Sequence, residues 1–282
     1  MGEADQTARY VPSQYWAALH RRGDLSAVGC SGLPPGINAW LYRTMASNVD
    51  RFLDRHGVRL DASDAAFEVG VGIGYWLSHW QALGAGRVDG CDLVPEAVDQ
   101  LNASIPPGHG RYRAADVSLP GALGDERYRL VAVLNVLLHI MDEERFDAAL
   151  ANVAGLVAPG GWLFMAEPIL FHPSWERRNT DGLTSRARPQ DRYLRPLLDG
   201  GLRLIAMEGA TALGSNPFEE RWRLGYAGFR GWWMLMAGTS RLAPWTSALF
   251  GRAICALDRP LLRLGAAPTT KFALLQRPPA GA

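Results

Sequence analysis

The chain has 282 residues, of which 48% are hydrophobic and 20% charged, and its formal net charge is +1. This composition is that of a folded globular protein and excludes a largely disordered chain. The near-zero net charge offers no long-range field for DNA or RNA, so we expect no nucleic-acid partner. Apolar stretches are short or interrupted by Arg252, and none reaches the roughly 20 residues of a membrane span, so we expect none.

Cysteine usage and the first residues bear on the cellular compartment. Cys30, Cys91 and Cys255 are far apart and lack the paired spacing of a zinc site or a redox motif. The first ten residues are polar and lack the basic flank and apolar stretch of a secretory signal. We therefore expect reduced thiols, a cytoplasmic protein and no bound metal.

Two helical patterns, 10–22 and 36–57, come first, and from residue 65 short apolar runs alternate with helical segments. The apolar runs cover 65–70, 87–93, 111–115, 130–138, 162–166, 202–208 and 270–276, and the helical segments cover 75–83, 95–103, 143–156 and 190–198. A long aromatic-rich helical insertion precedes the last run. Strands alternating with helices at this spacing predict an α/β fold with a mainly parallel sheet covered on both faces.

Three glycines stand where the first predicted strand turns into the next helix. The segment reads Glu68-Val-Gly70-Val-Gly72-Ile-Gly74-Tyr75. Glycines at such a turn let the backbone approach a ligand closely, so a nucleotide-like ligand is predicted. A dinucleotide fingerprint would need glycine at position 75, and a phosphate loop would need Gly-Lys-Ser/Thr. Neither pattern is present.

At this point the sequence resembles the class I S-adenosylmethionine-dependent methyltransferases, whose first motif has an acidic residue before Gly-x-Gly-x-Gly. The resemblance implies S-adenosylmethionine as the cofactor. By this resemblance Asp92 would accept hydrogen bonds from the ribose hydroxyls, and Leu93 would pack on the adenine. Asp116 and Val117 would read the adenine. The implied cofactor-binding residues are Glu68, Gly70, Gly72, Gly74, Asp92, Leu93, Asp116, Val117 and Asn135.

Three further segments match the family in order. Leu134-Asn-Val-Leu-Leu-His139 is similar to its fourth motif, Ala158-Pro-Gly-Gly161 to the turn before its fifth strand, and Ala267-Pro-Thr-Thr-Lys271 to the entry to its closing strand. The resemblance covers residues 64–211 and 268–278. It implies a doubly wound seven-stranded sheet of order 3-2-1-4-5-7-6 with an antiparallel last strand. We divide the chain into a helical cap (1–60), the cofactor-binding core (61–211), a helical insertion or lid (212–267), and the closing strand with the tail (268–282).

Candidates for acid–base chemistry follow the fourth and fifth predicted strands, on the ligand side of the sheet. His139, Glu167 and His172 could each orient or deprotonate a methyl acceptor. Each could equally be structural or a surface loop residue. Arginines between 177 and 195 could hold an anionic acceptor, although a solvated face is the simpler interpretation. The stripe of Trp222, Tyr226, Phe229, Trp233 and Met236 is more typical of a packed helix.

The sequence thus predicts an enzyme that methylates a small natural-product-like or sugar-like molecule, as in secondary metabolism, most simply on oxygen. N- or C-methylation stays open, and so does association as a homodimer. The rival hypothesis is a non-catalytic S-adenosylmethionine-binding domain that uses its aromatic insertion to bind another protein. We expect aromatic residues of the cap, Tyr15, Trp16, Trp40 and Tyr42, to help cover the acceptor.

Overall fold

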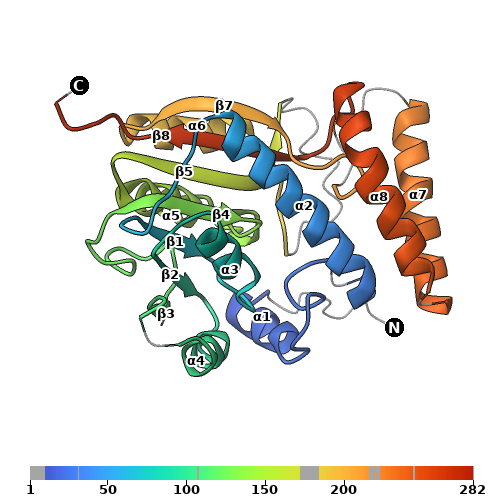
Figure 1. The fold of residues 1–282 in the computed structure, drawn as a ribbon, viewed down its shortest axis with the longest axis horizontal. Helices are drawn as coiled ribbons and strands as arrows, with labels where there is room; N and C mark the ends of the chain where they lie inside the picture. Colours follow the sequence, from blue (N-terminus) through green and yellow to red (C-terminus); the bar gives the residue numbers. More distant parts are fainter. Residues whose placement is uncertain are drawn as a thin grey trace, which may run out of the picture.

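The computed structural model describes residues 10–30, 32–106, 108–171, 184–215, 219, 223–243 and 245–281. A twisted sheet lies at the centre with helices on both faces, and a pair of long helices stands at one end of the molecule (Figure 1). His172 and Trp222 lie outside the described residues.

The strands of the sheet follow the order β3-β2-β1-β4-β5-β8-β7, with the short β6 paired to β5. Their bounds are β1 Ala65–Val69, β2 Arg87–Asp92, β3 Tyr112–Ala114, β4 Tyr128–Leu134, β5 Val157–Leu170, β6 Arg188–Pro189, β7 Arg203–Gly209 and β8 Thr270–Gln276. β8 pairs antiparallel with both β5 and β7, and the remaining pairs are parallel. Apart from β6, this is the predicted order 3-2-1-4-5-7-6 with an antiparallel last strand, so the fold prediction is confirmed.

The helices begin where the sequence offers favourable first-turn residues. Their bounds are α1 Pro12–His20, α2 Pro35–Arg55, α3 Tyr75–Ala82, α4 Pro95–Ser104, the 3-10 turn η1 Leu137–His139, α5 Glu143–Leu156, α6 Gln190–Asp199, α7 Arg223–Leu242 and α8 Thr246–Arg263. Proline opens α1, α2 and α4, where its missing N–H costs no hydrogen bond. Asp142 caps α5 by accepting from the Arg145 N–H at 2.9 Å.

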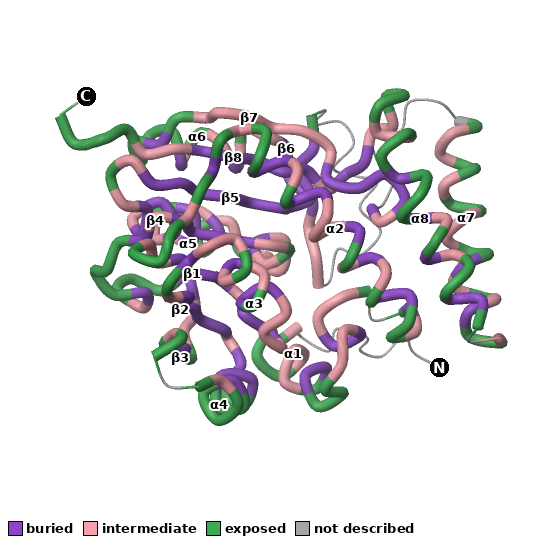
Figure 2. Tube along the Cα trace, in the orientation of Figure 1, coloured by how far each residue is buried: buried purple, intermediate pink, exposed green. Residues whose placement is uncertain are grey.

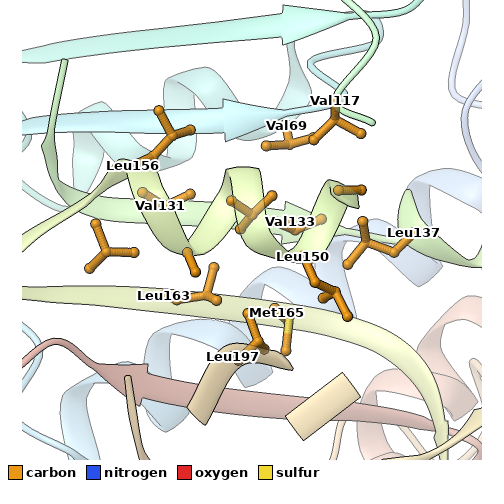
Figure 3. Close-up of a cluster of buried hydrophobic side chains, with 14 of the residues drawn as sticks. Val69, Val117, Val131, Val133, Leu137, Leu150, Leu156, Leu163, Met165 and Leu197 are labelled. Atoms are coloured by element: carbon orange, nitrogen blue, oxygen red, sulfur yellow. The ribbon is translucent and has the colours of Figure 1, made fainter. Parts of the chain in front are cut away.

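Buried apolar side chains cover both faces of the sheet. On one face, Leu150 of α5 and Leu197 of α6 pack against strand residues such as Val131 and Met165 (Figure 3). On the other face, α2, α3 and α4 contribute the second cluster, which includes the fully buried Trp80. With both faces covered, the strands are nearly continuous apolar runs, as the sequence indicated.

The fourth strand ends earlier than predicted, since β4 stops at Leu134 and the run to Leu138 instead enters η1. Asn135 turns the chain with φ of 55°, a left-handed conformation uncommon for a side-chain-bearing residue. The fifth strand is longer than its apolar centre, because β5 continues through Leu170 to pair with β6. Local hydrophobicity located both strands and misjudged where they end.

The helical insertion lies between β7 and β8 and consists of α7 and α8. α8 packs along α2, and α7 lies on the outer side of α8, at the end of the molecule (Figure 1). A third apolar cluster joins them to the cap, with Met236 and Ile254 packed near Ile37 and Leu41. Trp40, expected to cover the acceptor, instead lies against Gly251 of α8.

A buried polar network ties α8 to the cap and to the segment after β7. Asn48 Nδ2 donates to Asp258 Oδ2 at 2.9 Å and to the Ala210 carbonyl oxygen at 2.8 Å. The Leu213 N–H donates to Asp258 Oδ1 at 2.9 Å. Burial raises the pKa of the Asp258 carboxyl above its usual range, while the bonds from Leu213 and Asn48 oppose the shift.

We expect Asp258→Ala to lower the free energy of unfolding by about 1–3 kcal/mol, because it leaves the buried Leu213 N–H and one of the two Asn48 amide hydrogens without an acceptor. Urea denaturation followed by circular dichroism measures this. Asp99→Ala on the exposed side of α4 is the matched control and should change stability little. Equal effects of the two substitutions would contradict a structural role for this network.

Candidate functional site

A cavity of about 600 Å³ opens where β1, β2 and β4 end. Its size and its position at the carboxyl ends of parallel strands are those of ligand sites in open α/β sheets. Of the nine residues that the resemblance implied for the cofactor, eight line this cavity. They are Glu68, Gly70, Gly72, Asp92, Leu93, Asp116, Val117 and Asn135.

Gly74 is the ninth of these residues and does not line the cavity. It stands at the N-cap of α3, and a Cβ there would lie 2.7 Å from Leu101 Cδ2. Gly74 therefore allows the start of α3 to lie close to α4. Gly72 faces the cavity with φ of 53°, and a Cβ there would lie 2.8 Å from Val28 Cγ1. A side chain at position 72 would strain the backbone and push against the cap.

Asp92 ends β2 with a nearly buried carboxylate whose geometry is fixed by the backbone. Its Oδ2 accepts from the Gly72 N–H at 2.8 Å, and its Oδ1 accepts from the Val94 N–H at 3.0 Å. A carboxylate has about four acceptor positions, so two bonds leave capacity on the side that faces the cavity. The glycine turn and the Asp92 carboxylate thus form one rigid unit.

Asp116 has partners within the protein that the sequence did not indicate. Its Oδ1 accepts from the Ser118 N–H at 2.9 Å, and its Oδ2 is ion-paired with Arg145 of α5. Asp116 still lines the cavity, beside Val117 and Arg145. Any ligand that bonds to this carboxylate would share it with the arginine.

Glu68, the residue before the last of β1, has a buried carboxyl beneath the glycine turn. Its Oε2 accepts from Trp80 Nε1 at 3.0 Å. Burial raises the pKa of Glu68 well above its usual range, the bond from Trp80 opposes this shift, and the neighbouring Asp92 charge adds to it. The Glu68 carboxyl, at the base of the cavity, therefore keeps its proton to a higher pH than an exposed glutamate does.

A second cavity of about 390 Å³ adjoins the first. Seven residues line both cavities and form the boundary between them: Trp16, Val28, Tyr42, Trp76, Leu134, Asn135 and His139. Its other walls come from α1, α2, the segment around Thr184, the segment that follows β7, α7 and the start of β8. Two ligands bound in the two cavities would meet at this boundary.

His139 stands at the boundary, at the end of η1. Its Nδ1 lies 2.7 Å from the carbonyl oxygen of Thr184, and its ring meets the Trp16 ring edge-on at 4.6 Å between centroids. A carbonyl oxygen only accepts, so Nδ1 carries the proton in this contact. In the neutral imidazole Nε2 is then the basic nitrogen.

Glu167 of β5 lines neither cavity and is fully buried. Its Oε1 accepts from the N–H groups of Val136 and Leu137 at 2.7 and 3.1 Å, and its Oε2 from that of Leu138 at 3.2 Å. Burial raises its pKa to about 7 against these three bonds. In this structure Glu167 holds the η1 turn and reaches neither cavity, so we do not carry it forward as an acid–base candidate. His172, the third acid–base candidate, lies outside the described residues.

Three of the arginines considered for an anionic acceptor are paired within the protein, whereas Arg177 and Arg178 lie outside the described residues. Arg186, Arg188 and Arg192 all pair with Glu143 at the start of α5. Arg188 is itself buried, and its guanidinium lies over the Phe146 ring. These three arginines therefore stabilise the contact between α5 and the segment before α6. They do not line either cavity.

Several cavity residues could not be assigned from the sequence. Tyr10, His20 and Val28 of the cap line the first cavity, and Arg145 of α5 lines it from the other side. None belongs to a recognisable motif. Their roles depend on how the cap folds over the sheet, which only the aromatic content of the first 45 residues hinted at.

The fold and the site together define a nucleotide-binding α/β protein with a methyltransferase-type sheet. Residues 66–161 match a family described as "Methyltransferase domain". This part of the chain is therefore a class I methyltransferase domain, an enzyme family whose methyl donor is S-adenosylmethionine. None of the curated proteins matches the chain in sequence.

Several solved structures are similar to the chain at low sequence identity. A Listeria monocytogenes protein classed with the S-adenosylmethionine-dependent methyltransferases is 13% identical, with a TM-score of 0.50 over 82% of this chain and 97% of that one. The N-methyltransferase NodS from Bradyrhizobium japonicum is 15% identical, with a TM-score of 0.48 over 86% and 98%. The cyclopropane synthase MmaA2 from Mycobacterium tuberculosis is 13% identical, with a TM-score of 0.49 over 81% and 84%.

Two further features were sought among the described residues. Within them, no helix is both long and apolar enough to cross a membrane. The same residues contain no group of three or more His, Cys, Asp or Glu side chains that could hold a metal ion.

The raised pKa of Glu167 predicts a pH-dependent stability. Between its ordinary value of 4.5 and about 7, the folded protein keeps a proton that the unfolded chain releases. The folded state then binds more protons, so this contribution to stability falls as pH rises through that window. A shift of this size corresponds to about 3 kcal/mol.

Glu167→Gln removes the titrating carboxyl. Any loss of stability from weaker hydrogen bonds to η1 does not depend on pH. We expect the unfolding free energy of the variant, relative to the parent, to rise by about 3 kcal/mol from pH 4.5 to pH 8. Urea denaturation across this range measures the difference. Glu96→Gln on exposed α4 is the control. A difference that stays constant with pH would refute the assignment.

Proposed function

We propose that this protein transfers a methyl group from S-adenosylmethionine to the hydroxyl oxygen of a small, neutral and largely apolar molecule. The observation that carries the proposal is the pair of adjoining cavities with His139 at their boundary. The first has the glycine turn and acidic strand ends of a nucleotide site, and the second has a different, uncharged lining.

The first cavity fits S-adenosylmethionine. Gly72 leaves room where a Cβ would collide with the cap, and the Asp92 carboxylate keeps acceptor capacity beyond its two backbone bonds. We assign the ribose hydroxyls to Asp92 and the adenine to Leu93, Asp116 and Val117. When bound, the cofactor supplies an electrophilic methyl group on its sulfonium. The residues of the chain then act mainly by positioning the acceptor, which can provide much of the rate enhancement.

The second cavity has the chemistry of a neutral acceptor. Among the described residues that line it there is no Asp, Glu, Lys or Arg. Trp16, Leu41, Met45 and Trp233 provide apolar surface, and hydroxyl groups of residues such as Thr211 provide polar contacts. A largely apolar wall with a few hydroxyls favours a natural-product-like acceptor over a free sugar.

The same lining favours oxygen over nitrogen as the methylated atom. An amine is protonated near neutral pH, and burial of that cation without a carboxylate would be costly. No carboxylate lines the described part of the second cavity. A hydroxyl acceptor needs only to lose its proton, and we assign this step to Nε2 of His139, whose Nδ1 is anchored by Thr184. A cytoplasmic place in secondary metabolism agrees with this chemistry.

The cofactor assignment predicts a loss of affinity in Asp92→Asn. An amide cannot accept at both positions, so either the glycine turn or a ribose hydroxyl loses its partner, and Kd for S-adenosylmethionine should rise about 10- to 100-fold. Calorimetry with the cofactor or its demethylated product measures this. Asp99→Asn is the matched surface control. Unchanged affinity in Asp92→Asn would remove the assignment.

Turnover with labelled S-adenosylmethionine tests the reaction itself. We expect methylated product, identified by mass, from neutral hydroxylated apolar acceptors and little from charged analogues. His139→Gln should lower kcat about 10²- to 10⁴-fold while leaving cofactor affinity nearly unchanged. His109→Gln, at an exposed position, is the control. Cofactor binding without transfer to any acceptor of the set would favour the non-catalytic alternative.

A further inference from the structure

The outer side of α7 and α8 carries most of the exposed large hydrophobic side chains. We call residues 223–264 the hairpin. Of the 12 large hydrophobic residues exposed in the described chain, 8 lie in it. Leu224 and Leu242 are each 88% exposed and Trp245 is 73% exposed. A concentration of this kind on one element marks an interaction surface.

The helical period places these side chains on one face of α7. Leu224, Leu235 and Leu242 recur at whole-turn spacings, and the exposed Gly231 and Gly238 lie beside them. The opposite face, with Met236, packs into the third apolar cluster. α7 is thus apolar on both sides, a pattern typical of a helix covered all round. Its outer side nevertheless has no cover among the described residues.

This face lies at the end of the molecule. In Figure 1, α7 is the outermost helix, separated from the sheet by α8 and α2. Exposed positions run along α7 and α8 in Figure 2. An outermost row of leucines can meet a broad apolar layer without any pocket.

The charge of the hairpin is entirely positive at its surface. Its sequence contains six arginines and one acidic residue, a formal charge of +5 against +1 for the whole chain. The acidic residue is Asp258, which is buried in the network with Asn48. Arg252, Arg259 and Arg263 follow one side of α8 at helical spacing and are exposed.

The arginines of α8 also continue onto α2. α8 packs along α2, and the charges of Arg263, Arg51 and Arg55 lower the pKa of Arg259. Arg55 pairs with Glu208. The basic surface therefore extends from α8 onto α2 and has little counter-charge of its own.

We propose that the hairpin docks the protein onto an anionic membrane surface. The leucines of α7 and Trp245 lie at the boundary between headgroups and acyl chains, and the arginines of α8 bind lipid phosphates. This is the arrangement of an amphipathic helix that lies in the plane of the interface. It requires no spanning segment, in agreement with the described helices.

The positive charge of the hairpin favours an anionic membrane over a second copy of the chain as its partner. A two-fold contact through the hairpin would bring two sets of arginines together, with no exposed carboxylate on either hairpin to pair with them. An anionic bilayer supplies the missing counter-charge and needs no shape complementarity. The inference does not rest on the proposed methyl transfer, because membrane binding can be measured without any acceptor.

Flotation of the full chain with vesicles tests the proposal. We expect binding to vesicles of equimolar phosphatidylcholine and phosphatidylglycerol, and binding at least about tenfold weaker to phosphatidylcholine alone. Leu235→Gln with Leu242→Gln should lower binding about tenfold or more. Arg252→Gln with Arg263→Gln should lower vesicle binding about fivefold for each arginine. Added salt should also lower vesicle binding.

Matched exposed residues elsewhere provide the controls. Leu119→Gln with Leu198→Gln, and Arg195→Gln with Arg203→Gln, should retain parent binding. Thermal melts check that every variant is folded. The proposal is overturned if the parent does not float with anionic vesicles, or if the controls lose as much binding as the hairpin variants. It is also overturned if sedimentation shows a dimer that Leu235→Gln with Leu242→Gln dissociates.

Discussion

The arrangement of the site depends on the carboxyl group of Glu167, which accepts hydrogen bonds from three backbone N–H groups. By holding Val136, Leu137 and Leu138, it bends the chain immediately after β4. That bend sets Val136 against the glycine turn, where a Cβ on Gly70 would lie 2.4 Å from it. It also ends η1 with His139 at the boundary of the two cavities. One buried acid on β5 therefore positions groups that serve both cavities.

Much of the fold follows from local sequence. The alternation of apolar runs and amphipathic helices located seven strands, the resemblance to the methyltransferases implied their order, and Pro95 opens a helix as expected. The errors have a common cause. β4 ends at Leu134 because a distant glutamate holds the next residues, and β6 exists only because Arg188 reaches the end of β5. Neither partner is local, so apolar periodicity could not reveal either.

The same difference between local and distant interactions applies to the site residues. Asp92 and Asn135 were predicted from the family resemblance, and both line the first cavity because parallel strand ends meet at one edge of the sheet. Glu167 occupies an equivalent position in the sequence, yet its side chain turns into the protein. Its burial decides between an acid–base role and a structural one, and burial depends on packing that the sequence did not disclose. The aromatic cap shows the same limit, since Trp16 meets His139 while Trp40 meets α8.

The two proposals meet at α7, although either can fail without the other. Trp233, on the inner side of this helix, lines the second cavity, while the outer side presents the leucines of the hairpin. The helix is thus a wall of the uncharged cavity and also the most apolar exposed surface of the described chain. A neutral acceptor that partitions into a bilayer would be concentrated on the outer side of this wall. In that case the absence of charge inside the cavity and the positive charge around the hairpin would serve one purpose, because the first admits an apolar molecule and the second brings the enzyme to where such molecules gather.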